Sequence, residues 1–542
     1  MKNKGLLWIL VLLFAVLMSI PWLVPGTGFL ALIAFVPLLC ADAIADQVKI
    51  KHFFLYYYVA FVLWNAATTF WVCNATIGGG IFAILCNALQ MALIWLLFRL
   101  SKKGLGGVLP YIFLAVMWIA WERMYFRVDI SWPWLVLGNA FASTTNLVQW
   151  YEYTGTLGGS LWVWIVNLAF FSLIELKMDW ARYRWNCLAF LTYIFAFLLV
   201  TAGPVLCSEL MWFNFSEKSE GSLDVVIAQP NFDPYQKFDS MSQNEQNAVL
   251  LGQFGEELKK REGEAVRPVL LLAPETFTSD IRLNDVKESP TVRSFLDFLG
   301  KYPYAQILFG ASTYQFFETH SAPSILARKY GSVWAENHNS AILLKPDGDY
   351  DIFHKSKLVV GTELTPYPKV FVPLDDWLSE KMHVGGLMGR CIGQDEISLL
   401  DFNFRIPLGC AVCYESVFGE YCTGYVKKGA KALTVITNDA WWGDTPGYRQ
   451  HLNYSRLRAI ELRRDIARCG NTGISAFINQ RGDIVSQSEW WTRQTLTGNV
   501  NLNSGKTFFV ENGDIIGRVS TLAFLLLLLL AIVRGLIMKI RV

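Results

Sequence analysis

Long apolar segments alternate with short polar connections over the first 206 residues of the chain. The seven segments in this part are Leu6–Val24, Gly28–Ala45, Phe53–Cys73, Ile81–Phe98, Val108–Trp121, Ser160–Ile174 and Cys187–Leu206, and an eighth covers Ile515–Ile537. Most of them are close to the ~20 residues that an α-helix needs to cross a bilayer. The pattern predicts a multi-pass α-helical membrane domain over residues 1–206 and a C-terminal transmembrane helix at residues 515–537.

A different pattern fills residues 223–509, between the seventh and eighth segments. Short β-rich runs alternate there with stretches of helical periodicity, which is typical of a layered α/β domain. The expected strands are Leu223–Ala228, Val269–Leu272, Gln306–Phe309, Ser340–Leu344, Leu408–Val412, Ala432–Ile436 and Ile474–Ile478, and the expected helices are Asn244–Arg261, Val292–Lys301 and Tyr448–Arg468.

The composition is that of a membrane protein. Of the 542 residues, 53% are hydrophobic and 17% are charged, and the mean hydropathy of +0.33 is too high for an ordinary soluble enzyme. The formal net charge of +2 gives no indication of a nucleic-acid partner. Ten cysteines over this length do not form a disulfide framework.

Positively charged side chains are concentrated in alternate connections between the apolar segments. They are Lys2, Lys4, Lys49, Lys51, Arg99, Lys102, Lys103, Lys177, Arg182, Arg184, Arg534, Lys539 and Arg541. The short connections near Pro25 and at residues 74–80 contain no Lys or Arg. Because cytoplasmic connections carry the excess of Lys and Arg, both termini are expected in the cytoplasm. Residues 223–509 are then extracytoplasmic, and periplasmic if the cell has an outer membrane.

The connection Arg127–Gly159 lies on the outer side in this arrangement. Its stretch Asp129–Gly138, DISWPWLVLG, is aromatic and interrupted by proline. One interpretation is an aromatic belt at the membrane interface. The other is a floor at membrane level beneath the extracytoplasmic domain. The sequence leaves both open.

A buried strand is predicted at Leu408–Val412, and it ends in Cys413. A thiol there lies near unpaired backbone N–H groups of the following turn, which favour the thiolate and make Cys413 a candidate nucleophile. Cys410 on the same strand is expected to be a small buried hydrophobe. The C-x-x-C spacing also occurs in redox pairs. The chain has no second C-x-x-C and no histidine cluster, which argues against a metal site or a thioredoxin-like pair.

Polar residues follow the ends of several predicted strands, where α/β sheets usually place their sites. Glu275 comes after one strand, Lys355 after another, and Cys413 after a third. A carboxylate can take the thiol proton and return it, the thiolate is a nucleophile, and an ammonium can stabilise an oxyanion. Considered alone, each residue also has an ordinary interpretation. Glu275 is then a cap at the end of a strand, and Lys355 is a charge exposed to solvent.

The motifs around these residues resemble those of a known family. APE at Glu275, HKSKL at Lys355 and CYE at Cys413 look like the Glu-Lys-Cys triad of the nitrilase (carbon–nitrogen hydrolase) superfamily. With seven spans before this domain and one after it, the whole chain resembles the bacterial apolipoprotein N-acyltransferases. Further matching segments are Gln229-Pro230-Asn231, TNDAWWGD at Thr437–Asp444, Gln450-His451, Arg456 and Arg458.

The resemblance implies an extracytoplasmic α/β domain with the nitrilase-like αββα sandwich. It also implies that Glu275 is the general base, Lys355 the oxyanion-stabilising cation and Cys413 the nucleophile. Glu363 is then a second essential carboxylate near the site. Tyr414 and Glu415 are implied to support the loop that carries the nucleophile.

Two segments depart from the family pattern. The lysine loop usually reads K-x-H-L-x-P-F-G-E, whereas this chain has Lys357 in place of the histidine and Val360-Gly361-Thr362 in place of Pro-Phe-Gly. Lys355 is assigned to the triad because of its spacing to Leu358 and Glu363. A Trp often found after the first strand corresponds to Phe238 here, which places its substrate-stacking role in question.

The activity implied by the resemblance is a two-step acyl transfer in the bacterial cytoplasmic (inner) membrane. Cys413 takes an acyl chain from a phospholipid, and the N-terminal amine of a diacylglyceryl apolipoprotein then takes it from the thioester. No metal or organic cofactor is needed. The alternatives are a membrane-anchored amidase or nitrilase acting on a small amide, and a transporter or scaffold with a degenerate domain. The near absence of charges within the spans disfavours a transporter.

Two apolar segments flank the candidate triad. One is Val370–Met388, which includes Phe371 and Leu387, and the other contains Trp441 and Trp442. They are interpreted either as packing over the domain's own core or as a mobile substrate-binding lid that touches the bilayer. A long loop with little regular structure is a common place for such a lid.

Overall fold

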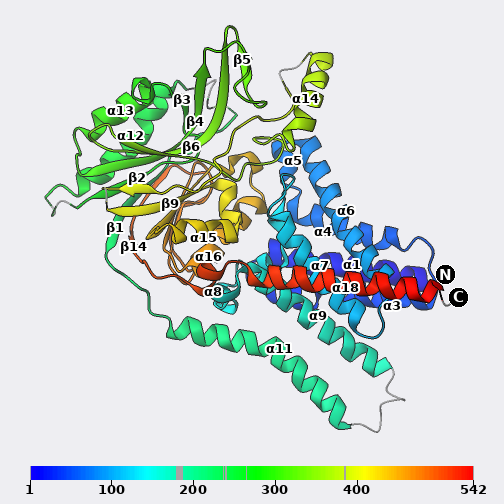
Figure 1. Ribbon diagram of the computed structural model, residues 1–542. Coiled ribbons are helices and arrows are strands. Elements are labelled where there is room, and N and C mark those ends of the chain that lie inside the picture. Colours follow the sequence, from blue (N-terminus) through cyan, green and yellow to red (C-terminus); the bar gives the residue numbers. More distant parts are fainter. Residues whose placement is uncertain are drawn as a thin grey trace.

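The computed structural model describes residues 2–178, 187–235, 237, 241–263, 265, 267–383, 386–403 and 405–540. A bundle of helices and an α/β domain lie next to each other (Figure 1). The first helix begins, and the last helix ends, at the end of the bundle farthest from the α/β domain (Figure 1). The two ends of the chain therefore lie on the same side of the bundle, as the distribution of Lys and Arg predicts.

The bundle is built from apolar helices. They are α1 (Lys2–Leu23), α2 (Ala31–Ala34), α3 (Val36–Gln47), α4 (Phe54–Thr69), α5 (Val72–Ala75), α6 (Ile77–Ser101), α7 (Leu109–Tyr125), α9 (Thr156–Met178), α11 (Cys187–Asn214) and α18 (Ile515–Ile540). Within the described residues, six of the eight predicted spans have the length and composition to cross a membrane. The other two, α4 and α7, have 16 and 17 residues and pack within the same bundle.

The second predicted span, Gly28–Ala45, is not one continuous helix. The 3-10 turn η1 (Gly28–Leu30) and α2 are followed by α3, which has a proline in its first turn. Proline lacks an N–H and interrupts the helical hydrogen bonds. At this break the N–H of Phe35 donates to Oδ1 of Asn167 on α9 at 2.7 Å. A side chain from a neighbouring helix therefore stabilises the interruption.

The connection between α7 and α9 lies beneath the α/β domain. It contains η2 (Pro133–Leu135), η3 (Leu137–Phe141), η4 (Thr145–Leu147) and α8 (Tyr151–Thr154). The hydroxyl of Tyr414 donates to the carbonyl of Ser131 at 3.0 Å. Trp134 is 1% exposed, and its ring N–H donates to Oε1 of Gln450 at 2.7 Å. These contacts pack the connection against the α/β domain, and its depth in the membrane stays a prediction.

The α/β domain contains two sheets. The first has the order β14-β1-β2-β4-β6-β5, with β3 on β4 and β7 on β6, and the second has the order β13-β12-β11-β10-β9-β8. The strands of the first sheet are β1 (Ser222–Gln229), β2 (Val269–Leu272), β3 (Thr278–Arg282), β4 (Ala305–Phe317), β5 (Arg328–Tyr330), β6 (Val333–Leu344), β7 (Tyr350–His354) and β14 (Gln494–Asn501). Those of the second are β8 (Leu400–Phe402), β9 (Ile406–Val412), β10 (Ala432–Thr437), β11 (Ile466–Gly470), β12 (Ala476–Ile478) and β13 (Ile484–Gln487).

The sheets pack face to face between two layers of helices. Alternate residues of a strand point to opposite faces, so Val225 and Ile227 join the core between the sheets, while Val226 and Ala228 pack under the outer helices. The helices of this domain are α12 (Gln243–Lys260), α13 (Pro290–Leu299), α14 (Pro368–Met382), α15 (Gly419–Lys427), α16 (Pro446–Leu462) and α17 (Phe508–Asn512). Helices α12 and α13 cover the first sheet, and α15 and α16 cover the second. The predicted αββα sandwich is confirmed.

One predicted helix is too long. The expected helix Tyr448–Arg468 ends at Leu462, and the next residues turn into the parallel strand β11. Arg463 adopts the left-handed conformation (φ 47°) at the end of α16. Glycine normally occupies such a position, so the sequence carries no clear stop signal there.

Helix α16 joins the α/β domain to the membrane bundle. Its side chains Tyr454, Leu457 and Ile460 belong to the apolar core of the bundle. Gln450 makes four hydrogen bonds with the bundle and its connection: its amide nitrogen donates to two carbonyls, and its amide oxygen accepts two ring N–H groups. The partners are the carbonyls of Trp22 and Thr68 and the rings of Trp71 and Trp134.

A buried charge network crosses the same junction. The guanidinium of Arg458 pairs with Glu461 at 2.7 Å and donates to the hydroxyl of Thr156 at 2.8 Å. Thr156, at the start of α9, also donates its N–H and its hydroxyl to Glu461 at 2.9 and 2.6 Å. Both charged side chains therefore depend on a residue of the membrane bundle.

Candidate active site

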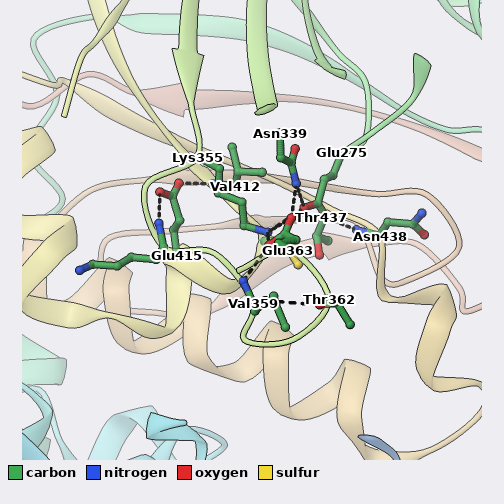
Figure 2. Close-up of polar contacts among 12 residues, drawn as sticks. Glu275, Asn339, Lys355, Val359, Thr362, Glu363, Val412, Glu415, Thr437 and Asn438 are labelled. Carbon is green, nitrogen blue, oxygen red and sulfur yellow. Dashed lines mark hydrogen bonds and ion pairs between the residues drawn. The ribbon is translucent and has the colours of Figure 1, made fainter. Parts of the chain in front are cut away.

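Glu275 stands three residues beyond the end of β2, and its side chain is buried. Oε1 accepts from Nζ of Lys355 at 3.0 Å and from Nδ2 of Asn339 at 2.8 Å (Figure 2). Oε2 accepts the backbone N–H of Asn438 at 3.0 Å. Donors from three separate segments of the chain therefore fix the position of this carboxylate.

Lys355 follows β7 and lies between two carboxylates (Figure 2). Its Nζ is 3.0 Å from Oε1 of Glu275 and 2.9 Å from Oε2 of Glu363. Burial alone would lower the pKa of Lys355, but the charges of the two glutamates raise it well above its usual value. The side chain is therefore an ammonium, which has three N–H donors. Three carboxylate oxygens surround Nζ, because Oε1 of Glu363 lies at 3.0 Å in addition to the two above.

Glu363 is held as firmly as Glu275. Its Oε1 accepts from Nδ2 of Asn339 at 2.7 Å, and its Oε2 accepts the N–H of Val359 at 2.8 Å. The single amide of Asn339 thus bridges the two carboxylates that flank Lys355. Sequence reasoning did not single out Asn339, because an asparagine in a β-strand carries no motif of its own.

Cys413 lies at the end of β9 and begins the 3-10 turn η6 (Cys413–Val417). Its backbone has φ 53°, in the left-handed region that non-glycine residues seldom adopt. Such a conformation costs on the order of 1–3 kcal/mol and persists only where the surroundings hold it. The strain occurs at the residue proposed from the sequence as the nucleophile, while Cys410 lies fully within the core between the sheets.

The thiol of Cys413 differs from the sequence-based expectation of a stabilised thiolate. Burial raises the pKa of this thiol well above its usual value, and the nearby Glu275 carboxylate raises it further against the opposing charge of Lys355. The start of a short 3-10 turn does not outweigh this desolvation. The resting side chain is therefore a neutral thiol that needs a base.

Glu415 ties the nucleophile loop to the lysine loop. Its carboxylate accepts the N–H of Val412 at 2.8 Å (Figure 2) and the N–H of Ser356 at 2.7 Å. The hydroxyl of Tyr421 adds a third hydrogen bond at 2.9 Å. Burial raises the pKa of Glu415 to about 7 against the effect of these donors. Tyr414, the other predicted supporting residue, packs its ring against Phe418.

A second buried group borders Cys413. The thiol sulfur of Cys413, a carboxylate oxygen of Asp439 and a ring nitrogen of His451 lie within 4.8 Å of one another. Burial alone would raise the pKa of Asp439, but His451 and Arg468 lower it to about 2. These donor types can bind a metal ion, yet Asp439 is already paired with Arg468 at 2.7 Å. From the sequence, Asp439 stands out as one of the polar residues after a predicted strand end, and His451 only as part of the family resemblance.

The predicted substrate-binding residues are placed differently from one another. Trp441 is 40% exposed, whereas Trp442 packs its ring against Trp71 of the bundle with a centroid distance of 4.5 Å. Phe371 is half-buried and Leu387 is 50% exposed. Phe238 lies outside the described residues. These assignments stay predictions.

The segment Val370–Met388 is not a long irregular loop. Helix α14 covers most of it and begins at Pro368, directly after the left-handed Tyr367. The N–H of Tyr367 donates to the carboxylate of Asp129 at 2.9 Å, which connects α14 to the floor between α7 and α9. Its exposed apolar side chains are Val370, Leu374, Trp377 and Met382.

Two family models match the chain. The apolipoprotein N-acyltransferase N-terminal domain covers residues 7–169, and the carbon–nitrogen hydrolase model covers residues 320–508. The second match contains Lys355 and Cys413 and begins after Glu275. The first match covers most of the helical bundle.

Curated relatives match over nearly the full length. The apolipoprotein N-acyltransferase of Chlorobaculum tepidum is 29% identical over 511 residues, which is 90% of this chain and 89% of that protein. The apolipoprotein N-acyltransferase of Geobacter metallireducens is 25% identical over 521 residues, which is 94% of this chain and 92% of that protein. The chain therefore belongs to the apolipoprotein N-acyltransferase family, within the nitrilase superfamily.

Proposed function

We propose that this protein transfers an acyl chain from a membrane phospholipid to the N-terminal amine of a diacylglyceryl apolipoprotein. The observation that carries the proposal is the position of Cys413, next to the buried Lys355–Glu275 pair and directly above the membrane bundle. Family membership supports the same activity. An amidase would use the same side chains but would not need a membrane bundle packed against the nucleophile loop.

In the first step Sγ of Cys413 attacks the ester carbonyl carbon of the phospholipid. Glu275 accepts the thiol proton, and the positive charge of Lys355 stabilises the oxyanion of the tetrahedral intermediate. The intermediate collapses when the carbon–oxygen bond breaks. Glu275 returns the proton to the leaving alkoxide, so a lysophospholipid departs and Cys413 carries a thioester.

In the second step the lipoprotein amine attacks the thioester carbonyl. Glu275 takes a proton from the amine nitrogen, and Lys355 again stabilises the oxyanion. The carbon–sulfur bond then breaks, and the departing thiolate regains a proton from Glu275. The products are the amide and the neutral thiol, which is the resting state described above.

The proposed setting is the bacterial cytoplasmic membrane, with the α/β domain on the periplasmic side. The distribution of Lys and Arg supports this orientation. Both substrates are lipids in the bilayer, and the floor between α7 and α9 reaches Tyr414, the neighbour of the nucleophile.

Intact-mass measurement of the purified full-length protein tests this proposal. Incubation with vesicles of a dipalmitoyl phospholipid should add one palmitoyl group to Cys413. Subsequent addition of a diacylglyceryl-cysteine peptide should remove the adduct and yield an N-palmitoyl peptide. Release of free palmitate without acylated peptide, or turnover of a small amide without any lipid adduct, would favour the hydrolase alternative instead.

The apolar side chains that flank the site, which are exposed at Trp441 and Leu387 and half-buried at Phe371, are proposed to admit lipid. Serine at Trp441, at Leu387 or at Phe371 should slow thioester formation from long-chain phospholipid about tenfold, because each loses apolar contact with the acyl chain. Alkylation of Cys413 by iodoacetamide should stay at the wild-type rate, since this reagent is small and soluble in water. Both rates are measured on the same preparations.

Two controls accompany this experiment. Val485→Ser removes an apolar side chain that is 69% exposed on β13, away from the site, and should change neither rate. Trp442→Ser removes packing against the bundle and should affect both rates together. A loss of both rates in Trp441→Ser and Leu387→Ser as well would assign these residues to packing.

A further inference from the structure

His451 lies directly behind the backbone of Cys413 and is fully buried. Its Nε2 is 3.1 Å from the carbonyl oxygen of Cys413 and 3.0 Å from Oγ of Ser416. A carbonyl oxygen can only accept, so Nε2 is the donor. Ser416 donates its hydroxyl to the same carbonyl at 2.8 Å. Two donors therefore hold one peptide group, the one that follows the strained Cys413.

The ring of His451 has a fixed orientation. Its Nδ1 lies 2.8 Å from Oδ1 of Asp439, and that carboxylate is held by the hydroxyl of Thr437 and by Arg468, each at 2.7 Å. A carboxylate can only accept, so Nδ1 donates to Asp439 while Nε2 donates to the carbonyl of Cys413. Asp439 thus directs Nε2 toward Cys413.

The helix that carries His451 is itself anchored. The preceding residue, Gln450, has all its hydrogen-bonding atoms engaged with the membrane bundle and its connection. The ring of His451 also packs against Trp134 and Trp442, at centroid distances of 5.8 and 5.6 Å. The donor to the Cys413 carbonyl therefore has a rigid base.

His451 is not placed as a base for the thiol. Among the described residues, its two ring nitrogens contact backbone, hydroxyl, carboxylate and guanidinium groups, and neither hydrogen-bonds the sulfur of Cys413. A Cys-His-Asp arrangement for nucleophile activation requires that contact. The hydrogen bond from His451 instead holds the carbonyl of Cys413, whose backbone is left-handed (φ 53°).

We infer that His451 is a positioning residue for Cys413, which acts through its hydrogen bond to the Cys413 carbonyl, and that Asp439 and Arg468 hold it in the required orientation. The inference rests on the proposed role of Cys413 as the acyl-accepting nucleophile. Loss of the hydrogen bond releases the peptide after Cys413, and the sulfur then loses its alignment with Lys355 and the ester carbon.

A matched pair of substitutions tests the inference in the full-length protein. The amide nitrogen of Gln in His451→Gln reaches the place of Nε2, whereas that of Asn in His451→Asn reaches the place of Nδ1. We expect His451→Gln to form the palmitoyl thioester within about tenfold of the wild-type rate. We expect His451→Asn to be slower by on the order of 100-fold, the effect of a small misalignment of reacting groups.

The apparent KM for the phospholipid should stay unchanged in both variants, because His451 touches no substrate. An amide cannot accept a proton as a base does, so equal loss of activity in both variants would indicate a base and overturn the inference. Equal retention of activity in both variants would also overturn the inference, because the hydrogen bond to the Cys413 carbonyl would then have no effect on the reaction. Cys413→Ala separates the two proposals: if that variant is still active, the proposed function fails, whatever the behaviour of the His451 variants.

Discussion

Cys413→Ala and Cys413→Ser are expected to form no thioester and to transfer no acyl chain, while the protein remains folded. Alanine offers no nucleophile, and a serine hydroxyl is far harder to deprotonate than a thiol. Loss of the chemical step is expected to reduce the rate by at least about 10³-fold. The measurement is N-acylation of a diacylglyceryl-cysteine peptide in phospholipid vesicles, with thermal unfolding of the same sample as a check of the fold.

Cys410→Ala is the matched control. This thiol is buried on the same strand and hydrogen-bonds the side chain of Thr434, and the backbone carbonyl of Cys410 accepts from the hydroxyl of Tyr425 at 2.8 Å. Removing the sulfur costs packing worth about 1 kcal/mol, so activity should persist. Full activity in Cys413→Ala would refute the assignment of the nucleophile.

Lys355→Ala is expected to reduce thioester formation by about 10²–10³-fold, because the oxyanion loses its charged donor. It also leaves Glu275 and Glu363 without their shared cation, and breaking a buried pair in this way destabilises by about 3–5 kcal/mol. Intact-mass measurement of acylation should therefore be made below the unfolding transition of the variant and normalised to folded protein.

Lys357→Ala should have a much smaller effect on the same measurement. The Nζ of Lys357 lies 5.6 Å from the ring centres of Phe418 and Tyr421, and its side chain is only half-buried. This comparison tests the chain's departure from the family's lysine loop, where a histidine usually stands two residues after the triad lysine. A greater loss in Lys357→Ala than in Lys355→Ala would exchange the two roles.

The central strands could be predicted from the sequence because their burial is uniform. Strands β2, β9 and β10 are buried along nearly their whole lengths and read as continuous apolar runs. Strand β11 escaped prediction because it contains Arg468, a charged residue fully buried in the sheet. The charge of Arg468 is compensated by Asp439 on a different segment. Because the two residues are far apart in the chain, the sequence around Arg468 gives no sign that it is buried. Strand β14, with few apolar residues, was missed as well.

Helix α14 was missed for another reason. Pro368 at its first position is a start signal, but Pro373 within it reads as a break. The flanking Tyr367 and His383 adopt left-handed conformations without glycine, so neither end is marked by composition. The apolar residues of this segment were recognised correctly, while their secondary structure was not.

The sequence predicted which strand ends carry the site residues, but not how the side chains of these residues are arranged in space. Glu275 and Cys413 follow strands of different sheets, and only the packing of those sheets brings their side chains together. Asn339 and His451 orient these groups through long-range contacts. Asn339 has no sequence neighbour that would mark it, and the matching segment Gln450-His451 does not show what its side chains contact, so the contacts of both residues became apparent only in three dimensions.

The charge network across the junction has a consequence for how the protein is made. Arg458 and Glu461 belong to the α/β domain, yet Thr156 of the membrane bundle supplies part of their hydrogen bonding. Chains generally fold from the N-terminus during synthesis, so α9 is available before α16 leaves the ribosome. Helix α16 can then assemble on a surface that already exists. We therefore expect the α/β domain to complete its folding against the membrane helices that precede it. We also expect Cys413 to reach its final position only after most of the membrane helices have been inserted into the bilayer.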